Sequence, residues 1–318
     1  MLQKNTTKGF TIVAYAGISD RAEETSRSVE LAQWKRQAAL YRVENGINDC
    51  PANYVFVYGN SALGTDDFCV MKYEAKNVDG VATSQAADRP WSSISQTDAV
   101  TQSANAGGHL ITDAEWMTIA ADIMKVKYNW TDGKVGAGFV QKGYVYFPAS
   151  YGAAASEDDS DIYFGIARLI YGTTSPDGSV DYSTPRYNSS RVHYLSSGEA
   201  IWDISGNYDE WTSDTITGAL PGASGYACRE YTSISSWGNL PIASRPSALN
   251  SVEGLENIAS WDSAQGIGQI CSDSSVTETR GLIRGGFYYG ALSAGVLSLR
   301  LHHTPSTPVN SVSFRVVR

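Results

Sequence analysis

The C-terminal segment, residues 284–318, restricts the fold more than any other stretch, because glycines recur there at fixed places among apolar residues. It begins Arg284-Gly285-Gly286 and ends Phe314-Arg315-Val316. Glycines permit a tight backbone path, and alternating Leu and Val residues would bury one face while the other faces solvent. The 30 glycines and 11% aromatic residues of the whole chain agree, since they favour a loop-rich α+β domain over a helical bundle.

Size and charge exclude several classes of protein. With 318 residues, 42% of them hydrophobic, the chain can bury the core of one large domain or of a domain with an appendage. The net charge of −9 repels phosphate backbones and anionic lipid, and no basic stripe offsets it, so we expect no nucleic-acid partner. No run of about 20 apolar residues is present, so we expect a soluble chain without a membrane partner.

The cysteines leave the redox state open. Cys50, Cys69, Cys228 and Cys271 are widely spaced and lack the C-x-x-C pair of a zinc site. In an exported protein Cys50 could pair with Cys69, and Cys228 with Cys271. Four buried thiols explain the same spacing equally well.

The N-terminus resembles a type IV pilin that lacks its hydrophobic helix. Lys8-Gly9-Phe10-Thr11-Ile12-Val13 resembles the end of a prepilin leader with the first residues behind it, and residues 39–46 resemble the close of the amphipathic pilin helix. The resemblance implies a stalk that contacts pilus subunits. We therefore divide the chain into residues 1–50, a pilin-like segment, and residues 51–318, a ligand-binding domain.

A helix is expected within this first segment. Ser19 or Asp20 would cap it, and Gly46 supplies a C-terminal stop. One helical face would carry residues that step by three and four, namely Leu31, Trp34, Ala38 and Tyr41. An ordinary amphipathic helix that packs on its own domain is the alternative to a pilin origin.

Two strands and one helix follow. Residues 53–58 and 68–74 are rich in β-branched and aromatic residues around a turn cluster, which predicts strands. Thr112 and Glu115 form a capping box, and a buried stripe follows at Trp116, Ile119, Ala120 and Ile123. We assign Asp113 and Glu115 to helix capping and not to acid–base chemistry.

The Ser/Gly/Ala-rich stretches predict surface loops at Val81–Gln102, Ser150–Ser160 and Gly218–Ser251.

Four motifs in order resemble formylglycine-generating-enzyme-like domains. They are the strand at 68–74, the helix start at 108–116, the aromatic and acidic run at 201–214, and the ending from Arg-Gly-Gly to Phe-Arg-Val. The resemblance spans most of residues 53–318. It implies an α+β, C-type lectin fold of the formylglycine-generating-enzyme (sulfatase-modifying-factor) type, in which the run at 201–214 is scaffold that buries its aromatic rings.

The catalytic residues of such enzymes are missing. Their terminal segment supplies two redox cysteines, and the matching positions here are Gly290 and Gly295. Without a thiolate there is neither a copper ligand nor a nucleophile, so we predict no catalytic residue. His302 and His303 would point to opposite faces of a strand and could not bind one metal together. We expect no cofactor; calcium is an alternative that no Asp-rich spacing supports.

The remaining features resemble the variable proteins of diversity-generating retroelements. In such proteins the retroelement mutates the positions between the framework residues. The framework here would be Gly290, Ala294, Gly295, Val296, Leu299, Leu301 and Pro305. The resemblance implies a ligand-binding, variable set made of Phe287, Tyr288, Tyr289, Ala291, Leu292, Ser293, Arg300, His302, His303, Val309 and Asn310. Aromatic rings with polar groups suit binding surfaces, although Tyr288 and Tyr289 could instead be core aromatics.

These features together predict a ligand-binding, receptor-recognition protein that is displayed on a pilus or cell surface. Its partner would be an unidentified protein or cell-surface ligand. Two alternatives stay open: a viral tail-tip receptor-binding protein, which would share only the lectin-like head, and a divergent metal-dependent enzyme of the same fold. Neighbouring DNA would test the diversification, and metal analysis would test the enzyme.

Overall fold

The computed structural model describes residues 26–47, 49–145 and 190–318. The chain divides into two compact units, Met1–Asn48 and Asp49–Arg318. Several predictions fall outside the described residues, namely the prepilin-like residues 8–13, a cap at Ser19 or Asp20, and the loop at 150–160.

The first unit contains the predicted helix, described over residues 26–44. Gly46 ends it in a left-handed conformation with φ of +66°, and its amide donates to the Val43 carbonyl at 3.2 Å. Of the predicted apolar stripe, Leu31, Trp34 and Ala38 are half-buried, whereas Tyr41 is exposed. In the part of the chain that the structure describes, this helix and the others are too short or too polar to cross a bilayer.

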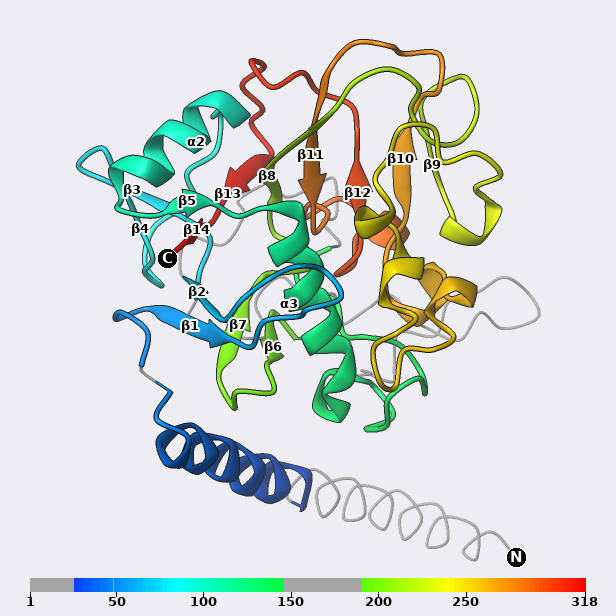
Figure 1. The fold of residues 1–318 in the computed structure, drawn as a ribbon. Coiled ribbons are helices and arrows are strands. Elements are labelled where there is room, and N and C mark those ends of the chain that lie inside the picture. Colours follow the sequence, from blue (N-terminus) through cyan, green and yellow to red (C-terminus); the bar gives the residue numbers. More distant parts are fainter. Residues whose placement is uncertain (1–25, 48, 146–189) are drawn as a thin grey trace, which may run out of the picture. The chain divides into compact units, whose positions relative to one another are not determined.

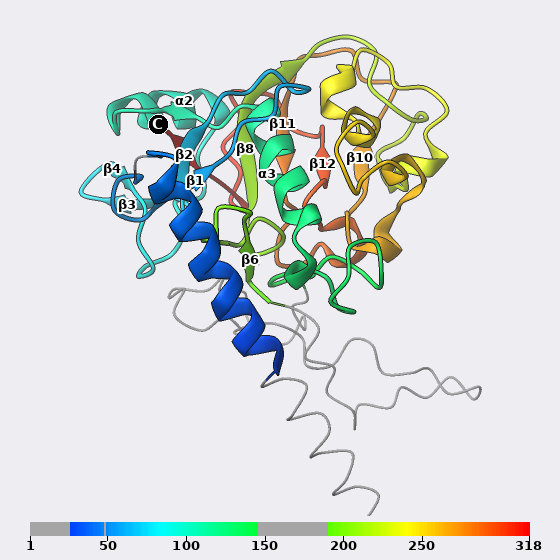
Figure 2. The same cartoon turned by 60° about the horizontal axis from the view of Figure 1, so that its bottom comes forward.

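The second unit is α+β and contains two main sheets (Figures 1 and 2). The four-stranded sheet has the order β1 (Tyr54–Val57), β2 (Phe68–Met71), β14 (Val316–Val317) and β5 (His109–Leu110). The six-stranded sheet has the order β13 (Val312–Phe314), β8 (Asp209–Ile216), β11 (Arg280–Arg284), β12 (Leu299–Arg300), β10 (Ile270–Ser272) and β9 (Ala227–Arg229). Two hairpins pair β3 (Lys76–Val78) with β4 (Val81–Thr83), and β6 (Val192–Tyr194) with β7 (Ala200–Trp202).

The end of the chain is part of the framework. In β14, Val317 pairs with Val70 of β2, and the Arg318 amide donates to the Cys69 carbonyl at 2.9 Å. Figure 1 shows the C-terminus beside β14. Because β11 enters the six-stranded sheet before residue 285 and β13 re-enters it after residue 311, the segment between them is fixed at both ends.

Helix α3 (Asp113–Lys125) begins as its sequence predicts. The Glu115 amide donates to Thr112 Oγ1 at 3.1 Å, and the Thr112 amide donates to Glu115 Oε2 at 2.8 Å, which completes the capping box. The predicted stripe is fully buried, with Trp116 among the largest buried side chains. In Figures 1 and 2, α3 lies beside β8 and β11 of the six-stranded sheet.

Two of the predicted loops contain regular structure. Residues 81–102 include β4 and the start of α2 (Gln96–Asn105), which Ser95 caps by accepting the Asp98 amide at 3.0 Å. Residues 218–251 include β9 and short 3₁₀ turns with buried residues such as Tyr231 and Leu249. The prediction of surface loops was wrong there, because a strand and part of a helix occupy the first stretch, and short 3₁₀ turns with buried residues occupy the second. The 3₁₀ turns are η1 (Lys127–Asn129), η2 (Tyr231–Ser233), η3 (Ile242–Ser244), η4 (Pro246–Leu249), η5 (Ile258–Ser260), η6 (Ser263–Gln265) and η7 (Ala291–Ser293).

Both disulfides that the sequence allowed are formed. Cys50 pairs with Cys69, and Cys228 pairs with Cys271. These are all four cysteines of the chain, so none has a free thiol. The alternative of four buried thiols was wrong.

Candidate ligand-binding surface

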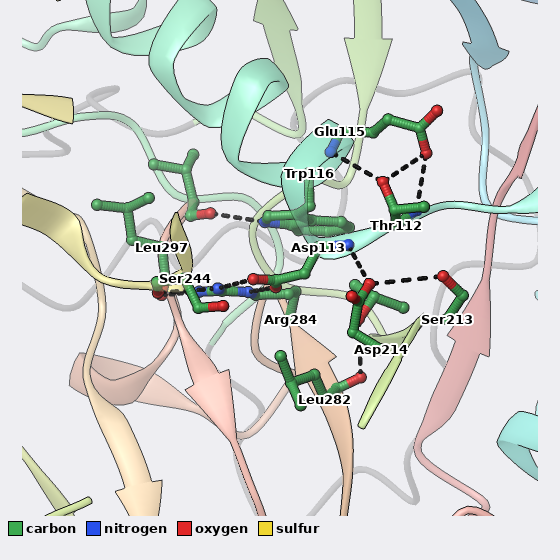
Figure 3. A network of polar contacts seen from close by, with 12 residues as sticks. Thr112, Asp113, Glu115, Trp116, Ser213, Asp214, Ser244, Leu282, Arg284 and Leu297 are labelled. Carbon is green, nitrogen blue, oxygen red and sulfur yellow. Dashed lines mark hydrogen bonds and ion pairs between the residues drawn. The ribbon is translucent and has the colours of Figure 1, made fainter. Parts of the chain in front are cut away.

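A buried arginine fixes the start of the C-terminal segment. The Arg284 guanidinium donates to both carboxylate oxygens of Asp113, at 2.7 and 3.0 Å, and to the carbonyls of Leu297 and Ser244, each at 3.1 Å (Figure 3). Arg284 is fully buried. The prediction that the Asp113 side chain caps α3 was wrong, because this carboxylate neutralises Arg284 instead. The pair joins β11, α3 and the later part of the segment.

A second buried arginine fixes the end of the segment. Arg315 Nε lies 2.9 and 3.0 Å from the two carboxylate oxygens of Glu210, and Nη1 donates to the carbonyls of Met71 and Lys72 at 3.1 Å. Burial raises the pKa of Glu210 to about 7, although the Arg315 guanidinium beside it acts in the opposite direction. These contacts connect the motifs at 68–74, 201–214 and 314–316, which explains why they occur together.

Main-chain contacts hold the backbone between the two arginines. The Tyr288 amide donates to the Asn207 carbonyl at 2.8 Å, and the Ala291 amide donates to the Val145 carbonyl at 3.1 Å. The buried Lys142 ammonium lies 3.5 Å from the Ala291 carbonyl, and burial lowers the pKa of Lys142 to about 8. None of these three contacts uses a side chain of the segment, so they do not depend on which side chains residues 288 and 291 carry.

Glycines pack closely against neighbouring backbone at Gly290 and Gly295, the two positions that the sequence resemblance matched to redox cysteines. At Gly295, a Cβ atom would lie 2.3 Å from both Gly268 N and Ile267 C, so any side chain would displace the backbone. At Gly290 the closest atom would be the Phe287 carbonyl oxygen, at 2.9 Å. Since all four cysteines are in disulfides, the chain has no thiol for copper or for nucleophilic attack.

The segment separates into buried and accessible positions. The buried framework residues are Gly290, Ala294, Gly295, Val296, Leu299 and Leu301, and Pro305 is half-buried. The exposed residues of the predicted set are Tyr289, Leu292, His302 and Asn310, and the half-buried ones are Phe287, Tyr288, Ala291, Ser293, Arg300 and His303. Tyr289 is 57% exposed and Leu292 is 48% exposed. Large apolar side chains therefore face solvent beside a framework that is almost completely buried.

Two predicted residues lie apart from this cluster. Val309 is only 8% exposed and packs in the hydrophobic core. Its assignment to the ligand-binding set was wrong, because its backbone pairs with Ile94 and turns the side chain inward. Asn310 is exposed on the turn before β13, and within the described residues no contact joins it to the others.

Phe287 and Arg300 form the centre of the surface. The Arg300 guanidinium lies 4.6 Å from the centre of the Phe287 ring and donates from Nη1 to the buried Asp209 carboxylate at 2.6 Å. The Phe287 ring also contacts the rings of Tyr288, at 5.5 Å, and Tyr289, at 6.5 Å between centroids. A cation over an aromatic face and edge-to-face rings are typical of rigid binding surfaces.

Tyr288 lies at the boundary between the core and the surface. Its ring lies 6.2 Å from that of Tyr144 and 5.9 Å from that of Tyr208, and both of these tyrosines are buried. Tyr288 itself is half-buried. It lies between the half-buried Phe287 ring and the buried tyrosines of the core.

The two adjacent histidines lie together, which corrects the prediction that they face apart. β12 ends at Arg300, so the alternation of a strand does not extend to His302 and His303, and their ring centroids are 4.6 Å apart. Burial lowers the pKa of His303 to about 4, and burial together with Arg300 lowers the pKa of His302. Both rings are thus neutral at pH 7. Among the residues described, no three His, Cys, Asp or Glu side chains form a group that could bind a metal ion.

Several residues of the surface come from outside the C-terminal segment. Tyr226, before β9, is 40% exposed, and its ring centroid lies 4.4 Å from that of His302. Tyr144, Tyr208 and Lys142 support the segment from below. The sequence indicated Tyr208 only as part of the run at 201–214 and Tyr144 and Tyr226 only through the excess of tyrosine, and it gave no signal for Lys142.

Comparisons with known proteins place this geometry in a family. A family model described as the sulfatase-modifying factor enzyme 1-like domain (FGE-sulfatase) matches residues 53–318. Curated proteins give no match. Solved structures give similarity to the Major Tropism Determinant I1 variant, with 12% identity, a TM-score of 0.31, and coverage of 84% of this chain and 52% of that chain. The U1 variant gives 13% identity, a TM-score of 0.30, and coverage of 83% and 48%.

This chain thus spans about half the length of those structures. The family model covers the sheets, α2, α3 and the whole candidate surface.

Proposed function

Residues 53–318 belong to the sulfatase-modifying factor enzyme 1-like domain family and have its C-type-lectin-like, α+β fold; from this premise we propose that the chain binds a protein or cell-surface ligand and is not an enzyme. The binding residues are the accessible side chains of residues 287–293, 300, 302 and 303. One observation supports this most, namely that Tyr289 and Leu292 face solvent beside a buried framework. Exposed apolar groups clustered in this way are typical of interaction sites.

The same surface is proposed to be diversified by a retroelement. The backbone of residues 288–291 is held by main-chain atoms and by Lys142, so changes of exposed side chains leave those contacts intact. Substitutions at such positions alter stability by only about 0.5 kcal/mol. The surface can therefore change its ligand without changing its fold.

Display on a pilus or cell surface, with the pilin-like N-terminal segment as stalk, completes the proposal. The proposal includes no calcium and no other cofactor, and several buried carboxylates pair with arginines, as in Glu210–Arg315 and Asp203–Arg191. Purified protein that contains copper or iron in stoichiometric amounts would instead support the divergent enzyme.

Selection from a library of random peptides displayed on phage, against the full chain, tests the binding surface. We expect enriched peptides to bind the unmodified protein and to lose at least tenfold in affinity for the Tyr289→Ser/Leu292→Ser variant. The matched control is Ile242→Ser/Val81→Ser, because Ile242 and Val81 are 69% and 47% exposed outside the segment. The proposal would be contradicted if the enriched peptides lost the same affinity for both double variants, or if no peptide were enriched.

A further inference from the structure

Tyr226 shares the candidate surface although it lies far from the C-terminal segment in sequence. β9 pairs antiparallel with β10 so that Ala227 faces Ser272, and β10 pairs parallel with β12 so that Cys271 lies beside Arg300. Tyr226 precedes β9 and His302 follows β12, so both lie beyond the same end of β10. Their ring centroids are 4.4 Å apart.

Tyr226 is fixed by its neighbours on both sides. Two residues later, the Cys228–Cys271 disulfide links β9 to β10. One residue earlier, the Gly225 carbonyl accepts from Arg229 Nη2 at 2.9 Å, and the Gly225 amide donates to Asp273 Oδ1 at 2.9 Å. Since β9 is a three-residue strand at the edge of the sheet, the disulfide is the main covalent restraint on this turn.

The charges around Tyr226 are already balanced. Arg300, whose guanidinium lies near Tyr226, is paired with Asp209, and Arg280 is paired with Glu278 at 2.9 Å. His302 and His303 are neutral at pH 7 because their pKa values are lowered. A ligand at this place therefore meets aromatic faces and hydrogen-bonding groups more than net charge.

We propose that Tyr226 is a constant contact of the binding surface, which stacks with His302 against an aromatic side chain of a protein ligand, and that the Cys228–Cys271 disulfide positions it. This inference rests on the proposed ligand-binding function. Tyr226 lies outside the segment that would be rewritten, so every variant of the segment keeps this aromatic group. The disulfide acts through Tyr226 and does not touch the ligand.

The test uses the full chain and the tightest peptide selected in the preceding experiment, with affinities measured by titration calorimetry. We expect Tyr226→Ala to weaken binding tenfold or more, and Tyr226→Phe to stay within threefold, because the ring is retained. Tyr41→Ala is the control, since Tyr41 is 56% exposed in the first unit. Alanine in place of the peptide's aromatic residues should weaken binding to the unmodified protein but make no further difference in Tyr226→Ala.

The disulfide is tested by Cys228→Ser/Cys271→Ser, with Cys50→Ser/Cys69→Ser as the matched control. We expect Cys228→Ser/Cys271→Ser to lower the affinity for the peptide at least threefold, and Cys50→Ser/Cys69→Ser to leave it unchanged. In the Tyr226→Ala background, Cys228→Ser/Cys271→Ser should cause no further loss of affinity. Peptides that depend on Tyr289 and Leu292 but bind Tyr226→Ala within twofold would overturn this inference alone. Peptides that do not depend on Tyr289 and Leu292 would overturn the proposed function itself.

Discussion

Replacement of Arg284 by methionine is expected to destabilise the second unit severely. Methionine keeps much of the length of the side chain but removes the charge and every donor. The Asp113 carboxylate, whose side chain is 5% exposed, would then be buried without its partner. The Ser244 carbonyl would also lose its Arg284 donor, whereas the Leu297 carbonyl would keep the Tyr231 hydroxyl.

The magnitude follows from these contacts. Removal of one partner from a buried ion pair costs about 3–5 kcal/mol, and the Ser244 carbonyl left without its donor costs about 1–3 kcal/mol more if no water reaches it. These costs are not additive, because water and the carbonyls can rearrange together. We therefore expect a loss of about 4 kcal/mol or more in the free energy of unfolding, a large share of the 5–15 kcal/mol typical of a domain.

Urea unfolding, followed by the fluorescence of the buried tryptophans, measures this loss. Arg280→Met is the matched control, because Arg280 lies on the same strand but pairs with Glu278, whose side chain is 73% exposed; we expect a change of about 1 kcal/mol or less. Adding Asp113→Leu to Arg284→Met should recover part of the loss, since no charge remains buried. A loss below about 1 kcal/mol for Arg284→Met would refute the assignment of this pair as the anchor of the segment.

Three further results are expected. Gly295→Ala should cost about 3 kcal/mol or more in urea unfolding, because its Cβ would lie 2.3 Å from backbone atoms; a smaller loss would mean that the backbone there can shift. Leu292→Ser should change the free energy of unfolding by about 0.5 kcal/mol at most, because Leu292 is 48% exposed. Val309→Ser should lower it by about 2 kcal/mol, because Val309 is only 8% exposed. Equal losses in the two variants would contradict the burial pattern. Burial lowers the pKa of His193 in the folded protein to about 4, whereas its pKa in the unfolded chain is about 6.5. As the pH falls, the unfolded chain therefore binds a proton at this histidine before the folded protein does. Because of this difference, the free energy of unfolding should fall by about 3 kcal/mol between pH 7 and pH 4. His193→Gln should remove that share of the fall, whereas an unchanged pH dependence would exclude His193 as its cause.

Local signals predicted the secondary structure that depends on neighbouring residues. The capping box of Thr112 and Glu115 and the stop at Gly46 are found where the sequence places them. The helix α2 was missed although Ser95 and Asp98 form its cap. Its hydrophobic stripe is weak, because the buried positions include Gln96 and Ser103, and a loop was the reasonable interpretation.

Contacts between distant residues could not be predicted in the same way. Asp113 was assigned to capping because its charge suits a helix start, but only the tertiary fold brings Arg284 to it. Val309 was assigned to the surface from its position between framework residues, and its pairing with Ile94 reverses that. Tyr226 contacts His302 because β9 and β12 flank β10 in the sheet, and sequence spacing does not show that order.

The most direct test of the central claim is the DNA sequence around the gene in its source genome. The account predicts a nearby reverse transcriptase and an imperfect repeat of the C-terminal coding segment. The repeat should differ from the gene mainly at adenines, and the differences should fall on the codons of accessible residues such as Tyr289, Leu292 and His302. Differences concentrated on the codons of Gly295, Val296 and Leu299, or the absence of both repeat and reverse transcriptase, would contradict it.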